Sequence, residues 1–145
     1  MKEIIFLAAF MLALAFTMPL FAAFESSTVS GNVIVTDTET GLIWQGTYTD
    51  KATWRGVLNY CENLTYAGYD DWRLPNKNEL ASLVNYTKYD PASDFPNMPS
   101  KVFCSSSTDV DNTSWVWQVN FKSGDVDGYC NSKTAVSCQV RCVRN

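Results

Sequence analysis

The sequence contains no histidine among its 145 residues. Histidine is the usual general base of serine and cysteine hydrolases and a common zinc ligand, so its absence excludes Ser-His-Asp catalysis, Cys-His catalysis and histidine metal sites. Basic residues are also few, with 11 Lys and Arg against 15 Asp and Glu and a net charge of −4. Because no basic stripe is present to neutralise phosphates, we expect no binding to nucleic acid.

Long apolar runs occur only at the N-terminus. Ile4–Phe16 is an unbroken apolar segment that is followed by Pro19 and small residues. This pattern predicts that residues 1–23 are a cleaved signal peptide. An uncleaved anchor over Ile4–Phe24 is the alternative, since about 20 residues span a bilayer, but the short apolar core and the proline favour cleavage. We therefore expect a secreted, cell-surface or periplasmic protein, with residues 24–145 forming one domain that makes no membrane contact after cleavage.

All five cysteines lie in the predicted exported part. They are Cys61, Cys104, Cys130, Cys138 and Cys142. An oxidising compartment makes disulfides the default. In an extended chain, Cys138 and Cys142 would lie about 13 Å apart, beyond the reach of a disulfide. A Cys130–Cys138 bond is feasible across a hairpin, and we favour it with Cys104 left unpaired. A bond from Cys104 to either Cys130 or Cys138 stays open.

The first half of the mature chain predicts a hairpin and a helix. Val33–Val35 and Leu42–Trp44 are β-prone runs separated by a polar cluster that ends in glycine. Asp50 can then cap a helix with one apolar face. The apolar positions of this helix are Trp54, Val57, Leu58, Cys61 and Leu64. Cys61 should therefore point into the core.

A second helix is predicted from Lys77 to Tyr86. Asn76 and Glu79 have the spacing of a capping box, and Leu80, Leu83 and Val84 supply an apolar stripe behind it. Residues 87–102 follow without any visible period. An irregular connection of this length is usually functional or mobile.

Strands dominate the last third of the chain. Residues 115–121 alternate between large apolar and other side chains, as in a strand that is buried on one face. A short strand over Val126–Cys130 and a final strand over Cys138–Val143 are predicted to follow. Helices that come early and strands that come late indicate an α+β fold with two helices and antiparallel strands, stabilised by disulfides.

Eight segments resemble a known bacterial family. They are Val35–Asp37, Gly41–Trp44, Cys61, Ala67–Tyr69, Asp71–Asn76, residues 105–107, Trp115–Phe121 and Val140–Arg144. Together they resemble the domain of unknown function 1566 family, also described as the C-terminal domain of a Legionella collagen-like adhesin, over about residues 33–144. The resemblance implies a C-type lectin-like fold, near the formylglycine-generating enzyme group, and a Cys61–Cys142 disulfide. Cys104 departs from the family pattern by replacing its usual tryptophan.

The resemblance implies a bacterial, non-catalytic adhesion module rather than an enzyme. We expect it to bind a glycan or an extracellular surface protein through loop 90–114 and the adjacent strand face. One alternative is a structural subunit of an extracellular assembly, in which the partner would be a second copy in a homo-oligomer. Another is a copper-dependent thiol oxidase using Cys138 and Cys142, which their separation in an extended strand disfavours.

The candidate ligand-binding side chains offer amide and carboxylate oxygens. They are Asp109, Asp111, Asn112, Gln118 and Asn120. We expect Trp115 and Trp117 to fill the core, although their rings also suit sugar stacking. No resident cofactor is expected, but calcium prefers hard oxygen ligands, and two carboxylate pairs offer them. These pairs are Asp109 with Asp111 and Asp125 with Asp127. Surface solubility explains the four carboxylates equally well. Arg73 is assigned a structural role beside Asp70 and Asp71.

Overall fold

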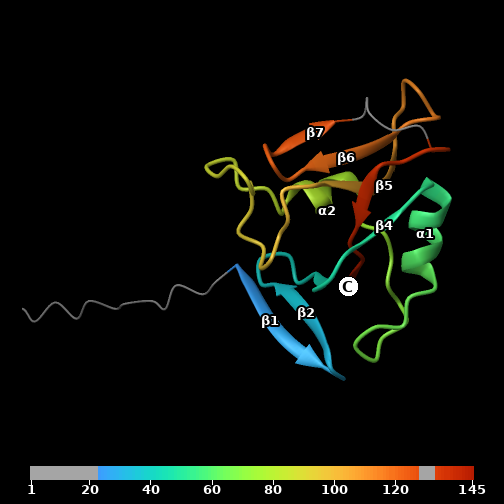
Figure 1. Cartoon of the computed structure of the whole chain (residues 1–145). Coiled ribbons are helices and arrows are strands. Elements are labelled where there is room, and N and C mark those ends of the chain that lie inside the picture. Colours follow the sequence, from blue (N-terminus) through green and yellow to red (C-terminus); the bar gives the residue numbers. More distant parts are fainter. Residues whose placement is uncertain (1–22, 128–132) are drawn as a thin grey trace, which may run out of the picture.

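The computed structural model describes residues 23–127 and 133–145. The predicted signal peptide therefore lies outside the described residues, apart from Ala23. Within these ranges the chain forms two β-sheets and two short helices, which confirms a mixed α+β fold (Figure 1). No helix in the same ranges is long and apolar enough to span a membrane.

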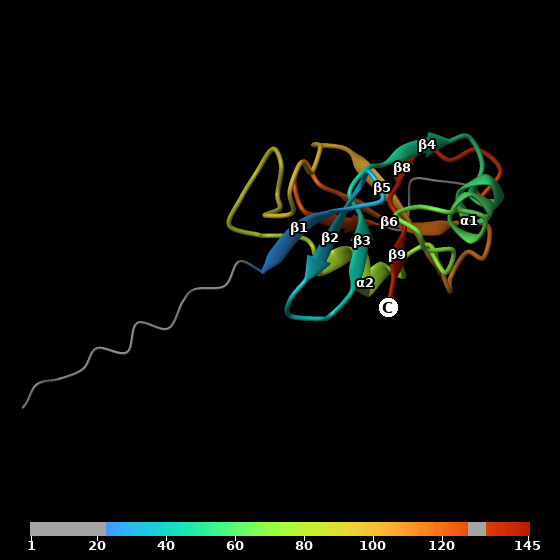
Figure 2. The ribbon, with the colours of Figure 1, turned by 90° about the horizontal axis from the view of Figure 1, so that it is seen from below.

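One sheet has the antiparallel strand order β1-β2-β3-β9 (Figure 2). Its strands are β1 (Phe24–Val29), β2 (Asn32–Asp37), β3 (Ile43–Gln45) and β9 (Val143–Arg144). The pairing of β2 with β3 confirms the predicted hairpin. β1 has no counterpart among the predicted strands because its polar centre shows no apolar alternation. A tight turn at Ser30 and Gly31, both with positive φ, folds β1 onto β2.

The other sheet has the strand order β4-β8-β5-β6-β7. Its strands are β4 (Thr49–Lys51), β5 (Val102–Thr108), β6 (Val116–Asn120), β7 (Asp125–Asp127) and β8 (Cys138–Val140). β5 and β8 run parallel, so the prediction of antiparallel strands fails for this pair. The predicted strand Val126–Cys130 begins in β7, and residues 128–132 lie outside the described part.

The predicted final strand Cys138–Val143 is divided between the two sheets. β8 pairs with β4 and β5, and β9 pairs with β3. Arg141 and Cys142 carry the chain from one sheet to the other, and both are fully buried. A single extended strand is therefore wrong, because the chain must change sheets to complete both of them.

Helix α1 (Trp54–Glu62) presents Val57 and Cys61 to the core, as predicted. Its N-cap is Thr53, whose hydroxyl accepts a hydrogen bond from the Gly56 N–H at 3.1 Å. The prediction that Asp50 caps this helix is wrong because Asp50 belongs to β4, opposite Gln139 of β8. The helix can begin only after that strand ends.

Helix α2 (Lys77–Ala81) starts with the predicted capping box. The Asn76 side chain accepts from the Asn78 and Glu79 N–H groups at 2.9 Å, and the Glu79 carboxylate accepts from the Asn76 N–H at 2.9 Å. The helix ends at Ala81 rather than Tyr86. Beyond it the chain turns away, and the Ser93 hydroxyl donates to the Leu83 carbonyl at 2.5 Å.

Two disulfides link distant segments. Cys61 on α1 bonds Cys142, the pairing that the family resemblance implies, and the two Cα atoms lie 5.5 Å apart. Cys104 on β5 bonds Cys138 on β8, also with a Cα separation of 5.5 Å. The favoured Cys130–Cys138 bond is therefore wrong, and so is an unpaired Cys104. The parallel pairing of β5 with β8 brings these two cysteines together.

The interior consists of two clusters of buried side chains. The disulfide cluster contains both disulfides and includes Val57, Cys61, Trp72, Leu74, Cys104, Val116, Cys138, Val140 and Cys142. The aromatic cluster includes Val35, Trp44, Leu80, Leu83, Phe95, Phe103, Val119, Phe121 and Val143. The aromatic cluster contains the buried face of α2, and the disulfide cluster contains that of α1.

A buried arginine lies against the aromatic cluster. Arg141 is 1% exposed, and its guanidinium carbon lies 4.4 Å from the centre of the Phe95 ring. Its Nη1 donates to the carbonyls of Gln45 at 2.9 Å and Gly46 at 3.2 Å. Its Nε and Nη2 have no hydrogen-bond partner within the described ranges. Burial lowers the pKa of Arg141 to about 10, so the side chain stays charged at neutral pH.

Candidate functional site

The predicted ligand residues of loop 109–115 are engaged in the loop itself. Asp109 is 7% exposed, and its carboxylate accepts from the N–H groups of Asp111 at 2.8 Å and Asn112 at 3.4 Å. The Asn112 side chain accepts from the Ser114 N–H at 3.1 Å. These bonds are typical of turns closed by Asp and Asn side chains. Asp109 and Asn112 therefore shape the loop, and of these three predicted ligand residues Asp111 alone is classed as exposed.

The predicted exposed face of β6 is wrong. Gln118 is 5% exposed and Val116 is fully buried, whereas Trp117 on the opposite face is only half-buried. Asn120 is half-buried, and its side chain accepts from the Lys122 N–H at 3.0 Å. The reason is that β6 lies inside its sheet, between β5 and β7, with a buried cluster on each face. A strand covered on both faces loses its period-2 burial pattern.

Trp117 carries a cation on its partly exposed ring. The ammonium of Lys77, at the start of α2, lies 4.0 Å from the ring centre. Trp115 is also half-buried, so neither tryptophan is the fully buried core residue that we expected. The Lys77 ammonium therefore occupies one face of the Trp117 ring.

The four predicted calcium ligands do not form a cluster. Asp125 and Asp127 lie on β7, opposite Asn120 and Gln118 of β6, while Asp109 engages its own turn. Among residues 23–127 and 133–145, no group of three or more Cys, Asp or Glu side chains is placed to hold a metal ion.

Arg73 has the predicted structural role but a different partner. It makes two hydrogen bonds of 2.8 Å to the carboxylate of Glu79 and a third of 3.0 Å to Asn145. Asp71 pairs instead with Arg144, at 2.6 and 2.9 Å. The side-chain hydrogen bond from Arg144 lowers the pKa of Asp71. These pairs anchor the segment before α2 to the C-terminal end of the chain.

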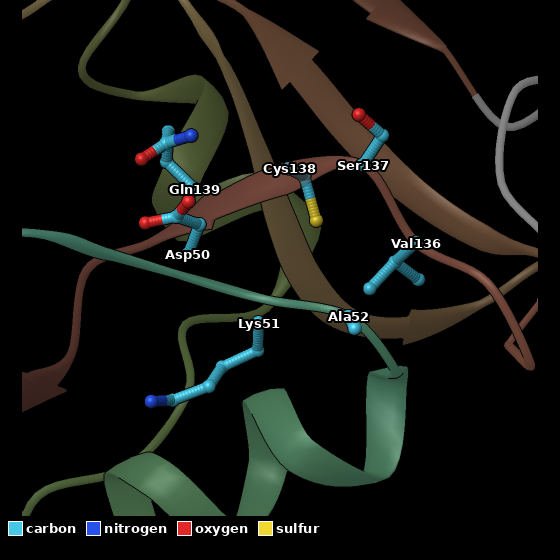
Figure 3. A pocket seen from close by; sticks show the side chains of 7 residues that line it. All are labelled: Asp50, Lys51, Ala52, Val136, Ser137, Cys138 and Gln139. Carbon is cyan, nitrogen blue, oxygen red and sulfur yellow. The ribbon is translucent and has the colours of Figure 1, made fainter.

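Both sulfurs of the suggested thiol oxidase pair are in disulfides. Cys138 bonds Cys104, and Cys142 bonds Cys61, so the two side chains cannot ligate one copper ion. Beside Cys138 lies an open groove of about 290 Å³, lined by residues of the paired strands β4 and β8 and of the chain next to them (Figure 3). Its lining residues are Asp50, Lys51, Ala52, Val136, Ser137, Cys138 and Gln139. None of these side chains is aromatic, so this groove offers no ring on which a sugar could stack.

A larger groove, of about 420 Å³, lies beside α2. We call it the Tyr86 groove. It is lined by Ala23, Phe24, Asp37, Glu39, Thr40, Ser82, Leu83, Val84, Asn85, Tyr86, Thr87 and Asp94. These residues come from the start of β1, the β2–β3 turn and the chain that follows α2. The groove thus combines two aromatic residues, Phe24 and Tyr86, with several hydroxyl, amide and carboxylate groups.

One wall of the Tyr86 groove is the β2–β3 turn. Asp37 is 4% exposed, and its carboxylate accepts from the N–H groups of Glu39 at 2.9 Å and Thr40 at 3.3 Å. It also accepts from the Thr40 hydroxyl at 2.6 Å. Asp37 therefore holds the turn in one conformation, while the Glu39 side chain remains exposed to solvent.

A second part of the lining is a wall formed by a hydrogen-bonded network around Asp94. Asn85 Nδ2 donates to Asp94 Oδ2 at 2.5 Å, and the Lys88 ammonium forms an ion pair with the same carboxylate. The Thr87 hydroxyl donates to Asn85 Oδ1 at 2.6 Å. Hydrogen bonds from Lys88 and then from Asn85 lower the pKa of Asp94, so it is ionised at neutral pH. The polar groups of this wall are consequently fixed before any ligand arrives.

Tyr86 supplies an exposed ring at the groove. It is 74% exposed, and Gly124 lies beneath it. A Cβ on Gly124 would lie 2.9 Å from Val84 Cγ1 and 3.5 Å from Tyr86 Cδ1, and the residue has φ +87. Glycine therefore lets the β6–β7 turn approach this segment. Tyr89 is 67% exposed but does not line the groove.

Of the predicted ligand-binding loop 90–114, only Asp94 lines the Tyr86 groove. Most of the other lining residues lie in the predicted hairpin turn or in residues 82–86, the predicted end of a helix. Ala23 and Phe24 lie at the predicted cleavage site, and Thr87 begins the aperiodic stretch. One signal was available: Tyr86 and Tyr89 are aromatic residues in a polar stretch next to an aperiodic region. Exposed aromatic rings of this kind are common in binding sites.

The comparisons with known proteins give one match. Residues 33–144 match the family model of the Lcl C-terminal domain. No curated protein and no solved structure matches the chain.

Proposed function

Because the chain belongs to the Lcl C-terminal domain family, we propose that it is an extracellular adhesion module that binds a glycan in the Tyr86 groove. The family suggests an extracellular, adhesion-related role, and the two disulfides agree with such a location. The observation that carries the glycan proposal is the largely exposed ring of Tyr86 beside a preorganised polar wall.

The chemistry of the groove suits a sugar ring. A pyranose has one apolar face of C–H groups, which can stack on an aromatic ring, and a rim of hydroxyls that both donate and accept hydrogen bonds. Tyr86 offers the ring, and Asn85, Thr87 and Asp94 offer matching polar groups on the same wall. Because these groups are held by one another, binding loses little side-chain entropy.

The negative charge of the groove limits the class of glycan that it can bind. Asp37, Glu39 and Asp94 line the groove, and the only lysine in its polar network, Lys88, is paired with Asp94. Carboxylates repel sulfate and carboxylate groups across a groove of this size. We therefore propose neutral or N-acetylated sugars rather than sulfated polysaccharides.

We also propose that the fold is C-type lectin-like and that the module is non-catalytic. The covalent bond from α1 to the last strands, with irregular segments on one side, supports this fold assignment. The disulfide state of Cys138 and Cys142 argues against the thiol oxidase alternative.

The test is a glycan panel probed with the purified secreted protein, followed by titration of any bound sugar. We expect Tyr86→Ala to weaken binding by about tenfold or more, because a central aromatic contact is lost. Tyr89→Ala is the matched control, since it removes a similarly exposed ring from the same segment outside the groove. Asp94→Asn should weaken binding too, by loosening the polar wall.

Three outcomes would contradict the proposal. One is a panel without any binding, another is equal affinity of Tyr86→Ala and the parent protein, and the third is a preference for sulfated over neutral sugars. Binding to a surface protein that is unaffected by Tyr86→Ala would point to the other ligand class and to another surface.

A further inference from the structure

β1 is the outermost strand of its sheet. Its inner edge pairs with β2 along the whole strand, from Phe24 opposite Asp37 to Val29 opposite Asn32. Within residues 23–127 and 133–145, no strand pairs with its outer edge. Figure 2 shows β1 at the end of the row of four strands. A free edge presents unpaired backbone N–H and C=O groups to any incoming strand.

The alternation of hydrogen-bonded and non-hydrogen-bonded pairs between β1 and β2 identifies which backbone groups of β1 face outward. The Thr38 N–H donates to the Ala23 carbonyl at 2.9 Å, so Ala23 and Thr38 form a hydrogen-bonded pair. In an antiparallel ladder such pairs alternate with non-bonded ones. Glu25, Ser27 and Val29 are therefore bonded to β2. The three even-numbered residues of the strand, from Phe24 to Thr28, direct their N–H and C=O groups outward.

The outer edge of β1 lacks the features that usually block pairing. It contains no lysine, no proline and no bulge, and its register with β2 is continuous over six residues. The side chains from Ser26 to Thr28 are short and exposed. Glu25 is the single charge on the strand.

From this edge we propose that β1 pairs antiparallel with β1 of a second copy of the chain, around a two-fold axis at Ser26. A two-fold axis perpendicular to the sheet matches even-numbered residues with even-numbered ones. Of these registers, the one centred on Ser26 uses all three outward-facing residues. It places Phe24 opposite Thr28 of the second copy, and Ser26 opposite its own equivalent.

The side chains are compatible with this register. Glu25 lies opposite the Ser27 hydroxyl of the second copy, so the charged side chain of the strand faces a neutral group. No residue of the strand faces a like charge directly across the interface. In the dimer, the two four-stranded sheets form one continuous sheet. Each dimer therefore has two Tyr86 grooves. The proposal does not depend on what those grooves bind.

The test is analytical sedimentation of the purified secreted protein over a range of concentrations. The parent chain is compared with variants that carry a charged side chain at Ser26, on the proposed two-fold axis. We expect the parent chain to form dimers as its concentration rises. Ser26→Lys and Ser26→Glu should each weaken dimerisation by about tenfold or more, because like charges then lie directly opposite. An equimolar mixture of the two variants should restore dimers, since every pair then joins opposite charges. Thr113→Lys, an exposed loop position, is the charge control and should dimerise like the parent.

Folding of each variant is checked by thermal unfolding, and the exposed position of Ser26 leads us to expect unchanged midpoints. Ser26→Pro is a second variant that should weaken dimerisation. Proline removes an outward-facing N–H group and leaves the hydrogen bonds of Glu25 and Ser27 to β2 intact. A parent chain that stays monomeric at the highest attainable concentration overturns the proposal. So does a dimer that persists in both charged variants, or a mixture of them that stays monomeric.

Discussion

The two halves of the interior are held together by different means. The disulfide cluster contains both covalent cross-links, which tie α1 to Cys142 and β5 to β8. The aromatic cluster has no cysteine and packs large rings against the buried guanidinium of Arg141. A small domain thus combines a cross-linked half with a half that depends on side-chain packing. The difference predicts distinct responses to reduction, to substitution and to acid.

The largest effect is expected from removing the Cys61–Cys142 bond. Its sequence separation is 81 residues, so cross-linking restricts the unfolded chain strongly, by about 4 kcal/mol in the chain-entropy model. Cys61→Ala with Cys142→Ala should lower the free energy of unfolding by that amount, as measured in urea. The Cys104–Cys138 bond, with a separation of 34, should contribute somewhat less.

Hydrogen exchange sharpens this comparison. In the Cys61 and Cys142 double variant, we expect amide protection to fall first in α1 and β8, which contribute buried residues to the disulfide cluster. Protection near Phe103 and Phe121 should fall only with global unfolding. Uniform loss of protection at low denaturant would mean that the two halves are not separable.

An intermediate effect is expected at Arg141. Lysine cannot reproduce the guanidinium, which stacks on Phe95 while donating to two carbonyls, and its compact ammonium is more strongly hydrated. Arg141→Lys should therefore lower stability by about 2 kcal/mol or more. Arg141→Met removes the buried charge and keeps the length, so it should be the milder change. A methionine variant less stable than the lysine variant would contradict this account.

The smallest effect is expected at the capping box of α2. Burial raises the pKa of Glu79, but hydrogen bonds from Arg73 and from the Asn76 N–H outweigh it, and the net pKa is lowered from 4.5. A carboxyl group whose pKa is lower in the folded state stabilises the protein above the unfolded pKa, and this stabilisation is lost as the pH falls through the folded pKa.

Glu79→Gln should therefore reduce the acid dependence of stability below pH 4.5. Its cost at neutral pH should be about 1 kcal/mol or less, because Arg73 is partly exposed and solvent screens the pair. The measurement is thermal unfolding as a function of pH. Identical acid profiles for the variant and the parent would show that this pair is energetically silent.

Local patterns predicted the local features of the fold. The capping box at Asn76, the inward face at Cys61 and the β2–β3 hairpin depend on short-range spacing, and the structure confirms them. The disulfide partner of Cys104 depends on a parallel contact between β5 and β8, which are far apart in sequence. No local pattern contains that information.

The candidate site was predicted less well than the fold, for a related reason. Gln118 lies on a strand with neighbours on both edges and cover on both faces, so alternation of residue types did not reveal its burial. The Tyr86 groove joins segments from the start of β1, the β2–β3 turn and the chain after α2. Sequence spacing does not show that three such segments meet, although the exposed tyrosines mark one of them.

The passage of residues 138–144 from one sheet to the other has a consequence for biogenesis. This segment supplies β8 to one sheet, β9 to the other and one cysteine to each disulfide. A growing chain that lacks it cannot complete either layer, so stable folding must wait until these last residues have been synthesised. Until these residues are made, the nascent chain has neither a complete sheet nor either disulfide, so it remains without a stable fold throughout its synthesis.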